Sequence, residues 1–512
     1  MSYSHFLPFR PVPFFPFNAC KDYRDHREDL ETIDDIIIRS GLDDFMLQRV
    51  LDRRRDAASD NKEHERGLEA HIRHVRTSFR VNILRTYYHL ESVRKMAIRL
   101  GDSPLDQWFC FVENFDQIKA PAKSSIDRFK NIFTEADRQA AFQMLLQKGA
   151  SSPDCYDQDL ESAVNLLGLE MPVNLLEAWY DSTCMSVNIH FPVDWVQLGD
   201  CCRSLLKAVR TIRKHGIKNR MPKGGSDYLL HELNQLLIAL GNARRRVDSK
   251  KLRKKVLRKL KKFSNKCAHH ARQHKELLQK ERERLTELSE AQADLIIQRL
   301  DKVLELLPLA REQAHERIIG ERRVPTADKI LSIHEPDINV IVRGKSGAEV
   351  EYGNQLTIGE NRDGLVTFYE LYKDVKNDSN RLIDAIDKTQ QNIGDLLDLI
   401  VGDRGYSDQK LDLKIEQEYP NIINHICPKS TTEMNEKKQE AVFRDSQKRR
   451  ASTEARIAIL TNNYQRGRSL SKGIDSQRVE LDWVMLTHNL RVFSRLRRAE
   501  ATARKERKKA AA

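Results

Sequence analysis

The sequence predicts an α/β protein: a mixed five-stranded sheet interrupted by a long helical insertion and preceded by an all-α N-terminal domain. Strand-like alternation of apolar and small polar residues occurs near 174–194 and returns after residue 326, whereas helical periodicity fills the remainder. A chain of 512 residues is also too long for one ordinary core. The expected boundaries are a flexible segment 1–24, a helical domain 25–165, a first part of the sheet domain 174–200, a basic helical insertion 201–325, the remainder of the sheet domain 326–496 and a basic disordered tail 497–512.

Composition points to a polyanionic partner. The net charge is +13, and neutralising phosphates with Lys and Arg releases condensed counterions. No apolar run is long enough to cross a bilayer, and residues 1–20 lack the basic leader and continuous apolar block of a signal peptide. Eight scattered cysteines without a CxxC pair fit a reducing cytoplasm. One cluster of metal-ligand types matches no zinc spacing and is interpreted as a solvated helix face: Cys267, His269, His270 and His274.

The N-terminal helical domain carries a candidate DNA-binding motif. A helix over Ser78–Leu100 is expected to end at Gly101–Pro104, and a second helix is expected over Pro121–Phe133. Two short helices with a basic second one suggest a helix-turn-helix, while the alternative is an ordinary helical bundle with a charged surface. The cations expected to contact DNA are Lys123, Arg128 and Lys130.

The insertion is strongly basic. Arg244–Lys262 contains about a dozen cations against one acid, which favours a helix that grips the DNA backbone, with Arg253 and Lys254 as representative contacts. The alternative is a solvated helical hairpin. The apolar residues recur every four positions and form one narrow packing stripe: Leu252, Val256 and Leu260.

The second half alternates strands and helices. The expected elements are a strand in Lys329–Arg343, a hairpin of Glu349–Glu360 and Leu365–Tyr372 around the Asp-Gly turn at 361–364, a helix Ser379–Ile393, strands Leu396–Val401 and Asn421–Cys427, and helices from about Glu436 to Asn463 and Gln477 to Ala499. Preceded by the strand at 174–194, this is the element order of an RNase H-like fold.

Three acids stand out along these elements. Asp181 lies within an apolar strand, where a carboxylate is costly unless something pairs with it. Asp403 follows an apolar strand, and Glu454 lies on a helix face with Arg450. Cleaving a phosphodiester with two Mg²⁺ ions requires about three carboxylates on rigid elements. Taken singly, Asp403 is equally a turn residue and Glu454 a surface residue, and Asp408 is most simply a helix N-cap.

At these residues the chain resembles the catalytic half of bacterial insertion-sequence transposases of the DDE type. The resemblance is carried by YDSTCMSVNIHFPVDW, the VEYG segment, VGDRGYSD, KRRASTEARIAIL and LDWVMLTHNLRVFSRL, and covers roughly two fifths of the chain. It implies Asp181, Asp403 and Glu454 as catalytic metal ligands, with Arg450 and Arg404 contacting DNA. Thr461 stands where such enzymes often have a Lys, a contact that Lys472 is a candidate to supply.

The resemblance implies a cytoplasmic, nucleoid-associated enzyme that uses two Mg²⁺ ions, with Mn²⁺ as a substitute. It would bind the terminal inverted repeats of its own element, cut one strand and direct the 3′-OH at target DNA, as a homodimer or higher assembly. Two alternatives remain open at this point: a structure-specific nuclease or resolvase with the same acids, and a nucleic-acid-binding protein without catalysis.

Overall fold

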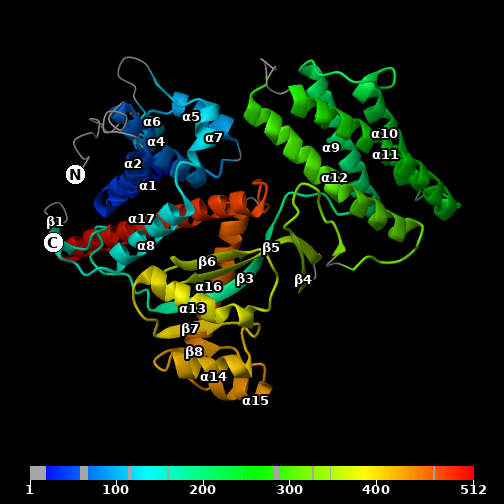
Figure 1. Ribbon diagram of the computed structural model, residues 1–512. Helices are drawn as coiled ribbons and strands as arrows, with labels where there is room; N and C mark the ends of the chain where they lie inside the picture. The colour runs from blue at the N-terminus through cyan, green and yellow to red at the C-terminus, as the bar shows by residue number, and fades with distance from the viewer. Residues whose placement is uncertain are drawn as a thin grey trace. The chain divides into compact units, whose positions relative to one another are not determined.

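The chain forms two compact units in the computed structural model. Unit 1 comprises Met1–Val187 and Gly353–Ala512, and unit 2 is Asn188–Tyr352. The structure describes residues 19–57, 67–90, 92–112, 118–157, 162–243, 245–281, 288–325, 328–345, 348–464 and 467–511. Unit 1 is therefore assembled from two separate stretches of sequence, with unit 2 inserted between them in the chain (Figure 1).

The first stretch of unit 1 is mainly helical, as the sequence predicts. It also contains a small antiparallel pair of strands, β1 (Cys155–Asp157) and β2 (Ser162–Val164). Its described helices are α1 (Lys21–Ser40), α2 (Leu42–Ala57), α4 (Leu68–Tyr87), α5 (Val93–Asp102), α6 (Pro104–Phe109), α7 (Lys123–Phe129) and α8 (Glu135–Ala150).

Two boundaries in this stretch differ from the sequence-based expectation. Helix α1 begins at Lys21, inside the segment 1–24 that was expected to be flexible, and residues 1–18 lie outside the described residues. The single helix expected over Ser78–Leu100 is two helices, α4 and α5. The hydroxyl of Ser92 starts α5 by accepting a hydrogen bond from the backbone N–H of Arg94 at 3.2 Å, which is an N-cap that favours a new helix.

A mixed sheet combines β3, from the end of the first stretch, with strands from later in the chain. It has six strands rather than the predicted five, in the order β4-β5-β3-β7-β8, with β6 also paired to β5. Strands β3 and β5 are antiparallel, as are β5 and β6, whereas β3 pairs in parallel with β7 and β7 with β8. The strands are β3 (Glu177–Ser186), β4 (Asn339–Lys345), β5 (Ala348–Glu360), β6 (Val366–Tyr372), β7 (Leu399–Gly402) and β8 (Ile423–Ile426).

Alternation along β3 assigns its side chains to two helices on opposite faces of the sheet. The Tyr180 hydroxyl is buried at 2.7 Å from the hydroxyl of Thr389 on α13 (Leu382–Ile393). The indole N–H of Trp179 donates to the carbonyl of Ser446 on α16 (Ala441–Ala458) at 2.9 Å. Because successive residues of a strand point to opposite faces, Asp181 shares the α16 face with Trp179.

Three further elements of the second stretch lie near β8 and α16 in the sequence. Helices α14 (Gln409–Glu418) and α15 (Thr431–Lys437) flank β8 in the sequence, and α16 continues into a π-helical turn, η5 (Ile459–Tyr464). The long helix expected from about Glu436 to Asn463 is therefore α16 plus this turn. A π-helical turn in an α-helix often accompanies a functional site.

The C-terminal tail is helical, so the prediction of disorder over 497–512 is wrong for its described residues. Helix α17 runs from Ile474 to Ala511. The side chain of Glu500 accepts the backbone N–H groups of Glu170 and Met171, and Arg504 pairs with Glu170. These contacts to a distant part of the chain offset the charge repulsion that the basic composition suggested.

Unit 2 contains four described long helices and extends beyond the predicted insertion 201–325. They are α9 (Asp194–Lys214), α10 (Gly225–Ala243), α11 (Ser249–Glu281) and α12 (Glu290–Ile318). The basic helix α11 packs an apolar face that includes the buried Val256 and Leu260. The interpretation of this cluster as a solvated face holds for the exposed His269 and is wrong for Cys267, His270 and His274, which are buried. The strand expected over Lys329–Arg343 begins only at Asn339.

Among the helices that the structure describes, none combines the length and apolar character needed to cross a bilayer.

Candidate functional site

Asp181 and Asp403 lie level with each other on neighbouring parallel strands. The register pairs Trp179 of β3 with Val401 of β7, and each aspartate follows its paired residue by two positions. Asp403 comes directly after the last residue of β7, so it lies at the strand's carboxyl end. Carboxyl ends of parallel strands are the usual place for sites in α/β sheets. The pairing of two strands more than 200 residues apart thus brings the two acids to one edge.

Both aspartates are half-buried and accept local backbone hydrogen bonds. Oδ1 of Asp181 accepts the N–H of Ser182 at 2.8 Å, and Oδ1 of Asp403 accepts the N–H of Gly405 at 2.8 Å. A Cβ at Gly405 would lie 2.9 Å from Oδ1 of Asp403, too close for an ordinary contact. A residue without a side chain at position 405 therefore keeps the space beside the Asp403 carboxylate open.

Helix α16 supplies the third acid and a cation. Ser446, Arg450 and Glu454 are spaced four residues apart and share one helix face. The Ser446 carbonyl on this face accepts the indole N–H of Trp179, two residues before Asp181 on the same side of β3. Arg450 and Glu454 continue that face along the helix, beyond the contact with Trp179.

Two further interactions fix α16 against the sheet. The Gln447 amide donates to the carbonyl of His425 on β8 at 2.6 Å. On the neighbouring face, Arg449 and Arg456 both pair with the fully buried carboxylate of Glu360 on β5, at 2.9 and 3.0 Å. Bonds to both β8 and β5 restrict rotation of the helix, which holds the face carrying Arg450 and Glu454 in a defined direction.

The electrostatics of Asp181 report the proximity of the other site residues. The pKa of Asp181 is raised from 3.8 to about 6, chiefly by burial and also by the negative charges of Asp403 and Glu454. The N–H of Ser182 and the charge of Arg450 act in the opposite direction. The fold therefore brings Asp403, Glu454 and Arg450 within electrostatic reach of Asp181, and Glu454 is the most exposed of the three acids.

A fourth acid, Asp378, lies at this edge and was missed by the sequence reasoning. Its Oδ1 accepts the side-chain amide of Gln355 at 2.9 Å, and its Oδ2 lies 3.1 Å from where a Cβ of Gly405 would be. Burial raises the pKa of the Tyr406 hydroxyl, and Asp378, Asp181 and Asp403 raise it further. Asp378 begins a short 3₁₀ helix, η4 (Asp378–Asn380), in a segment that carries no recognisable motif, and its only sequence signal is its place after a strand.

The donor set suits a hard divalent cation, but no preformed metal site is present among the described residues. Asp181, Asp403 and Glu454 offer carboxylate oxygens, which Mg²⁺ and Mn²⁺ prefer. Burial, together with the negative charges of Asp403 and Glu454, raises the pKa of Asp181, and a bound cation would stabilise its charged form. Within the described part of the chain, however, no three His, Cys, Asp or Glu side chains converge closely enough to hold an ion. The residues fit in chemistry and position, and their side chains would have to converge for binding.

The predicted DNA-contacting residues fall into three groups. Arg404 is exposed next to Asp403, and Arg450 is half-buried beside Asp181, with no acceptor for its Nε among the described residues. The second group is local to α7: Lys130 pairs with Asp127 at 3.6 Å and Arg128 Nε donates to the Ser124 carbonyl. That group also includes the exposed Lys123, and the third group, Arg253 and Lys254, belongs to unit 2.

Thr461 has an internal role. Its hydroxyl donates to the carbonyl of Ile457 at 2.8 Å within the π-helical turn η5. The Thr461 hydroxyl is therefore hydrogen-bonded to the backbone of its own helix. A threonine also cannot supply the positive charge of a lysine. Lys472, the candidate replacement, is exposed and lines a separate cavity in unit 1.

Comparison with known proteins adds no relative. No protein-family model, no curated protein and no solved structure matches this chain.

Proposed function

We propose that this protein is a metal-dependent DNA transposase with an RNase H-like catalytic core. The observation that carries the proposal is the meeting of Asp181, Asp403 and Glu454, which come from two strands and a helix, at one sheet edge. The chain order of unit 1 supports the fold: β3, the hairpin β5–β6, α13, β7, α14, β8 and α16.

The three acids would hold the divalent cations. When bound, two such ions supply a stronger oxygen nucleophile and stabilise the charge on the attacking and leaving oxygens of a phosphodiester. Asp181 and Asp403 are presented by rigid paired strands, whereas Glu454 is exposed on α16 and completes the set from the solvent side. A raised pKa at Asp181 means that cation binding competes with a proton, so the affinity for metal falls as the pH drops below about 6.

Cations beside the acids are suited to the DNA backbone. Arg450 projects an Nε without an acceptor from the same helix face as Glu454, and a guanidinium is well matched to phosphate oxygens. The exposed Arg404 follows Asp403 directly. The net charge of +13 supplies the long-range attraction that brings DNA to the protein. In the proposed complex, Arg450 holds the phosphate near the scissile bond and the acids act on that bond.

The test is a Mg²⁺-dependent assay on DNA carrying the inverted repeats that flank the gene. Glu454→Gln keeps the shape of the side chain but removes its charge, and we expect it to lower strand cleavage by about a hundredfold or more. The matched control is Glu416→Gln, an exposed glutamate on α14, which should cut like the wild type. Joined product would distinguish a transposase from a nuclease. Undiminished cleavage by Glu454→Gln would remove that residue from the site.

A further inference from the structure

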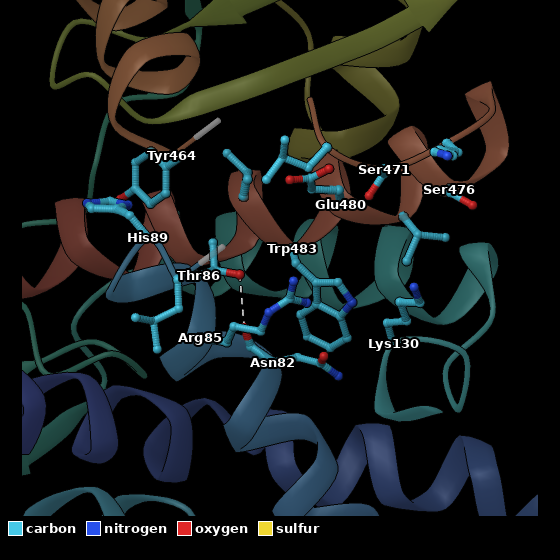
Figure 2. A pocket seen from close by; sticks show the side chains of 15 residues that line it. Asn82, Arg85, Thr86, His89, Lys130, Tyr464, Ser471, Ser476, Glu480 and Trp483 are labelled. Carbon is cyan, nitrogen blue, oxygen red and sulfur yellow. Dashed lines mark hydrogen bonds between the residues drawn. The ribbon is translucent and has the colours of Figure 1, made fainter. Parts of the chain in front are cut away.

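Unit 1 contains a second polar site, separate from the residues of the acid cluster. A cavity of about 370 Å³ lies where α4 and the end of α7 meet the segment from Tyr464 to Val484. Figure 2 shows the labelled side chains arranged around it. Its volume falls in the range of pockets that hold small organic ligands. None of the acids assigned to cleavage lines it.

The charged groups of this cavity favour an anion. Three cations line it, Arg85, Lys130 and Lys472, against one acid, Glu480. Glu480 accepts a hydrogen bond from the hydroxyl of Ser469 at 3.0 Å and keeps its charge, which acts on Arg85, while Lys130 also pairs with Asp127 at 3.6 Å. The cations therefore exceed the acids within a partly enclosed space, which attracts a negatively charged ligand.

Two hydrogen-bond donors in the wall have no acceptor among the described residues. One is Nε1 of Trp483, a residue that is only 4% exposed, and the other is Nε of Arg85. Both atoms are buried. A buried donor without a partner costs free energy, and such groups are rare in folded proteins. Burial also lowers the pKa of Arg85, which a bound anion would reverse. Ligand oxygens in the cavity would give both donors a partner.

Other walls of the cavity are apolar or aromatic. Leu90, Leu470 and Val479 line it, and the rings of His89 and Tyr464 meet edge to face with their centroids 4.6 Å apart. A bare inorganic anion would leave these surfaces uncovered. A ligand with an anionic group and a flat, partly apolar body would use both kinds of wall.

We propose that this cavity binds one nucleotide, with its phosphate at Arg85, Lys130 and Lys472 and its base against the apolar and aromatic wall. The choice of a nucleotide among phosphorylated compounds rests on the proposed action on DNA. The same chemistry is available from a free mononucleotide or from a nucleotide within a DNA strand. In either case, the indole N–H of Trp483 donates to the ligand.

The position of Trp483 allows a test that reports on the cavity itself. The full chain contains four tryptophans, so labelling with 5-fluorotryptophan gives four ¹⁹F resonances, and Trp483→Phe identifies the one from the cavity. The probes are 5′-dAMP, deoxyadenosine, inorganic phosphate and a short 5′-phosphorylated single-stranded oligonucleotide, all in EDTA. We expect 5′-dAMP or the oligonucleotide to shift the Trp483 resonance saturably, and deoxyadenosine to leave it in place. A shift with the oligonucleotide alone identifies a strand as the source.

Paired variants test the cations. Lys130→Ala with Lys472→Ala should raise the Kd by about tenfold, the change expected when roughly one charged hydrogen bond is lost. The control is Lys414→Ala with Lys505→Ala, two exposed lysines that do not line the cavity. An unmoved Trp483 resonance, an equal response to deoxyadenosine, or an equal response to inorganic phosphate overturns the proposal. So does an unchanged Kd in the Lys130/Lys472 variant.

Nucleotide binding in the cavity can be tested independently of strand cleavage. Asp403→Asn should abolish strand cleavage and bind the nucleotide like the wild type, because the carboxylate does not line the cavity. Loss of cleavage with an intact Trp483 response, or the reverse, therefore separates failure of one proposal from failure of the other.

Discussion

The buried acids of the N-terminal helices and the acids at the carboxyl end of β7 differ in whether they form ion pairs with a cation. In the helices, the fully buried guanidinium of Arg80 on α4 pairs with Asp34 of α1 and Asp43 of α2. Burial opposes the charge of Arg80, but the two carboxylates outweigh it and raise the pKa of the guanidinium. Both carboxylates pair directly with one buried cation, which is the pattern of a structural network.

At the sheet edge, Asp181, Asp403 and Glu454 make no such ion pair among the described residues. The pKa of Asp181 is raised toward neutrality, chiefly by burial and also by the negative charges of Asp403 and Glu454, against the single opposing charge of Arg450. An excess of negative charge destabilises the folded protein unless a ligand uses it, so such an excess is typical of functional sites. The comparison teaches that direct ion pairing with a buried cation separates the structural acids of this molecule from the candidate catalytic ones.

The largest expected effect on stability comes from breaking the ion pairs of Arg80. Arg80→Met leaves Asp34 and Asp43 buried without their cation and should lower the free energy of unfolding by about 3–5 kcal/mol. Arg73→Met is the control, because its pairing with Glu69 is exposed and should contribute less than about 0.5 kcal/mol. Urea denaturation followed by circular dichroism measures both. Equal losses in the two variants would contradict the assignment of Arg80 to a structural network.

The next effect is a pH dependence with a defined sign. Because the pKa of Asp181 is raised from 3.8 to about 6, the folded protein holds the proton more tightly than the unfolded chain. The stability that protonation of Asp181 contributes to the folded protein is therefore fully present below about pH 3.8 and is lost as the pH rises through about 6. In Asp181→Asn, the free energy of unfolding should lose roughly 3 kcal/mol of its dependence on pH, and this variant should be more stable than the wild type at pH 7.

Denaturation from pH 4 to pH 8 in EDTA, compared between wild type and Asp181→Asn, gives that difference directly. The pKa of Asp482 is also raised to about 6 by burial, but this residue is present in both proteins and its contribution cancels. If the difference in stability between wild type and Asp181→Asn stayed constant with pH, the pKa of Asp181 would not be raised in the folded protein.

The smallest expected effect concerns Asp408, an acid near the site in sequence that has a structural partner. Its carboxylate accepts the backbone N–H groups of Lys410 and Leu411 and caps α14, as the sequence predicts. Asp408→Ala should cost about 1 kcal/mol of stability and leave strand cleavage unchanged, whereas Asp408→Asn should retain the cap. If Asp408→Ala cut DNA as poorly as Glu454→Gln, the distinction between capping and catalytic acids would not hold.

Much of the candidate site could be predicted from local pattern. Asp181 and Asp403 stand out because each lies in or directly after an apolar strand, and Glu454 shares a helical face with Arg450 at a spacing of four residues. Parallel pairing of β3 with β7 then sets the two aspartates level. The absence of an ion pair to the three acids could not be predicted from the sequence, since many acids have cations nearby in the chain.

Features that depend on distant contacts could not be predicted. Asp378 reaches the site from a segment without a motif, held by Gln355 from another strand. The tail appeared disordered from its charge, yet Glu500 and Arg504 find partners about Glu170, more than 300 residues away. The burial of His274 in unit 2 likewise depends on packing among four helices rather than on local composition.

The central claim is that Asp181, Asp403 and Glu454 together form a divalent-cation site, and Mn²⁺ binding followed by electron paramagnetic resonance tests it most directly. For the full-length wild type at pH 7.5 we expect about two ions to bind in the presence of DNA. Asp403→Asn should lose this binding, while Asp395→Asn, an exposed aspartate before β7, should keep it. Wild-type stoichiometry and affinity in Asp403→Asn would contradict the claim.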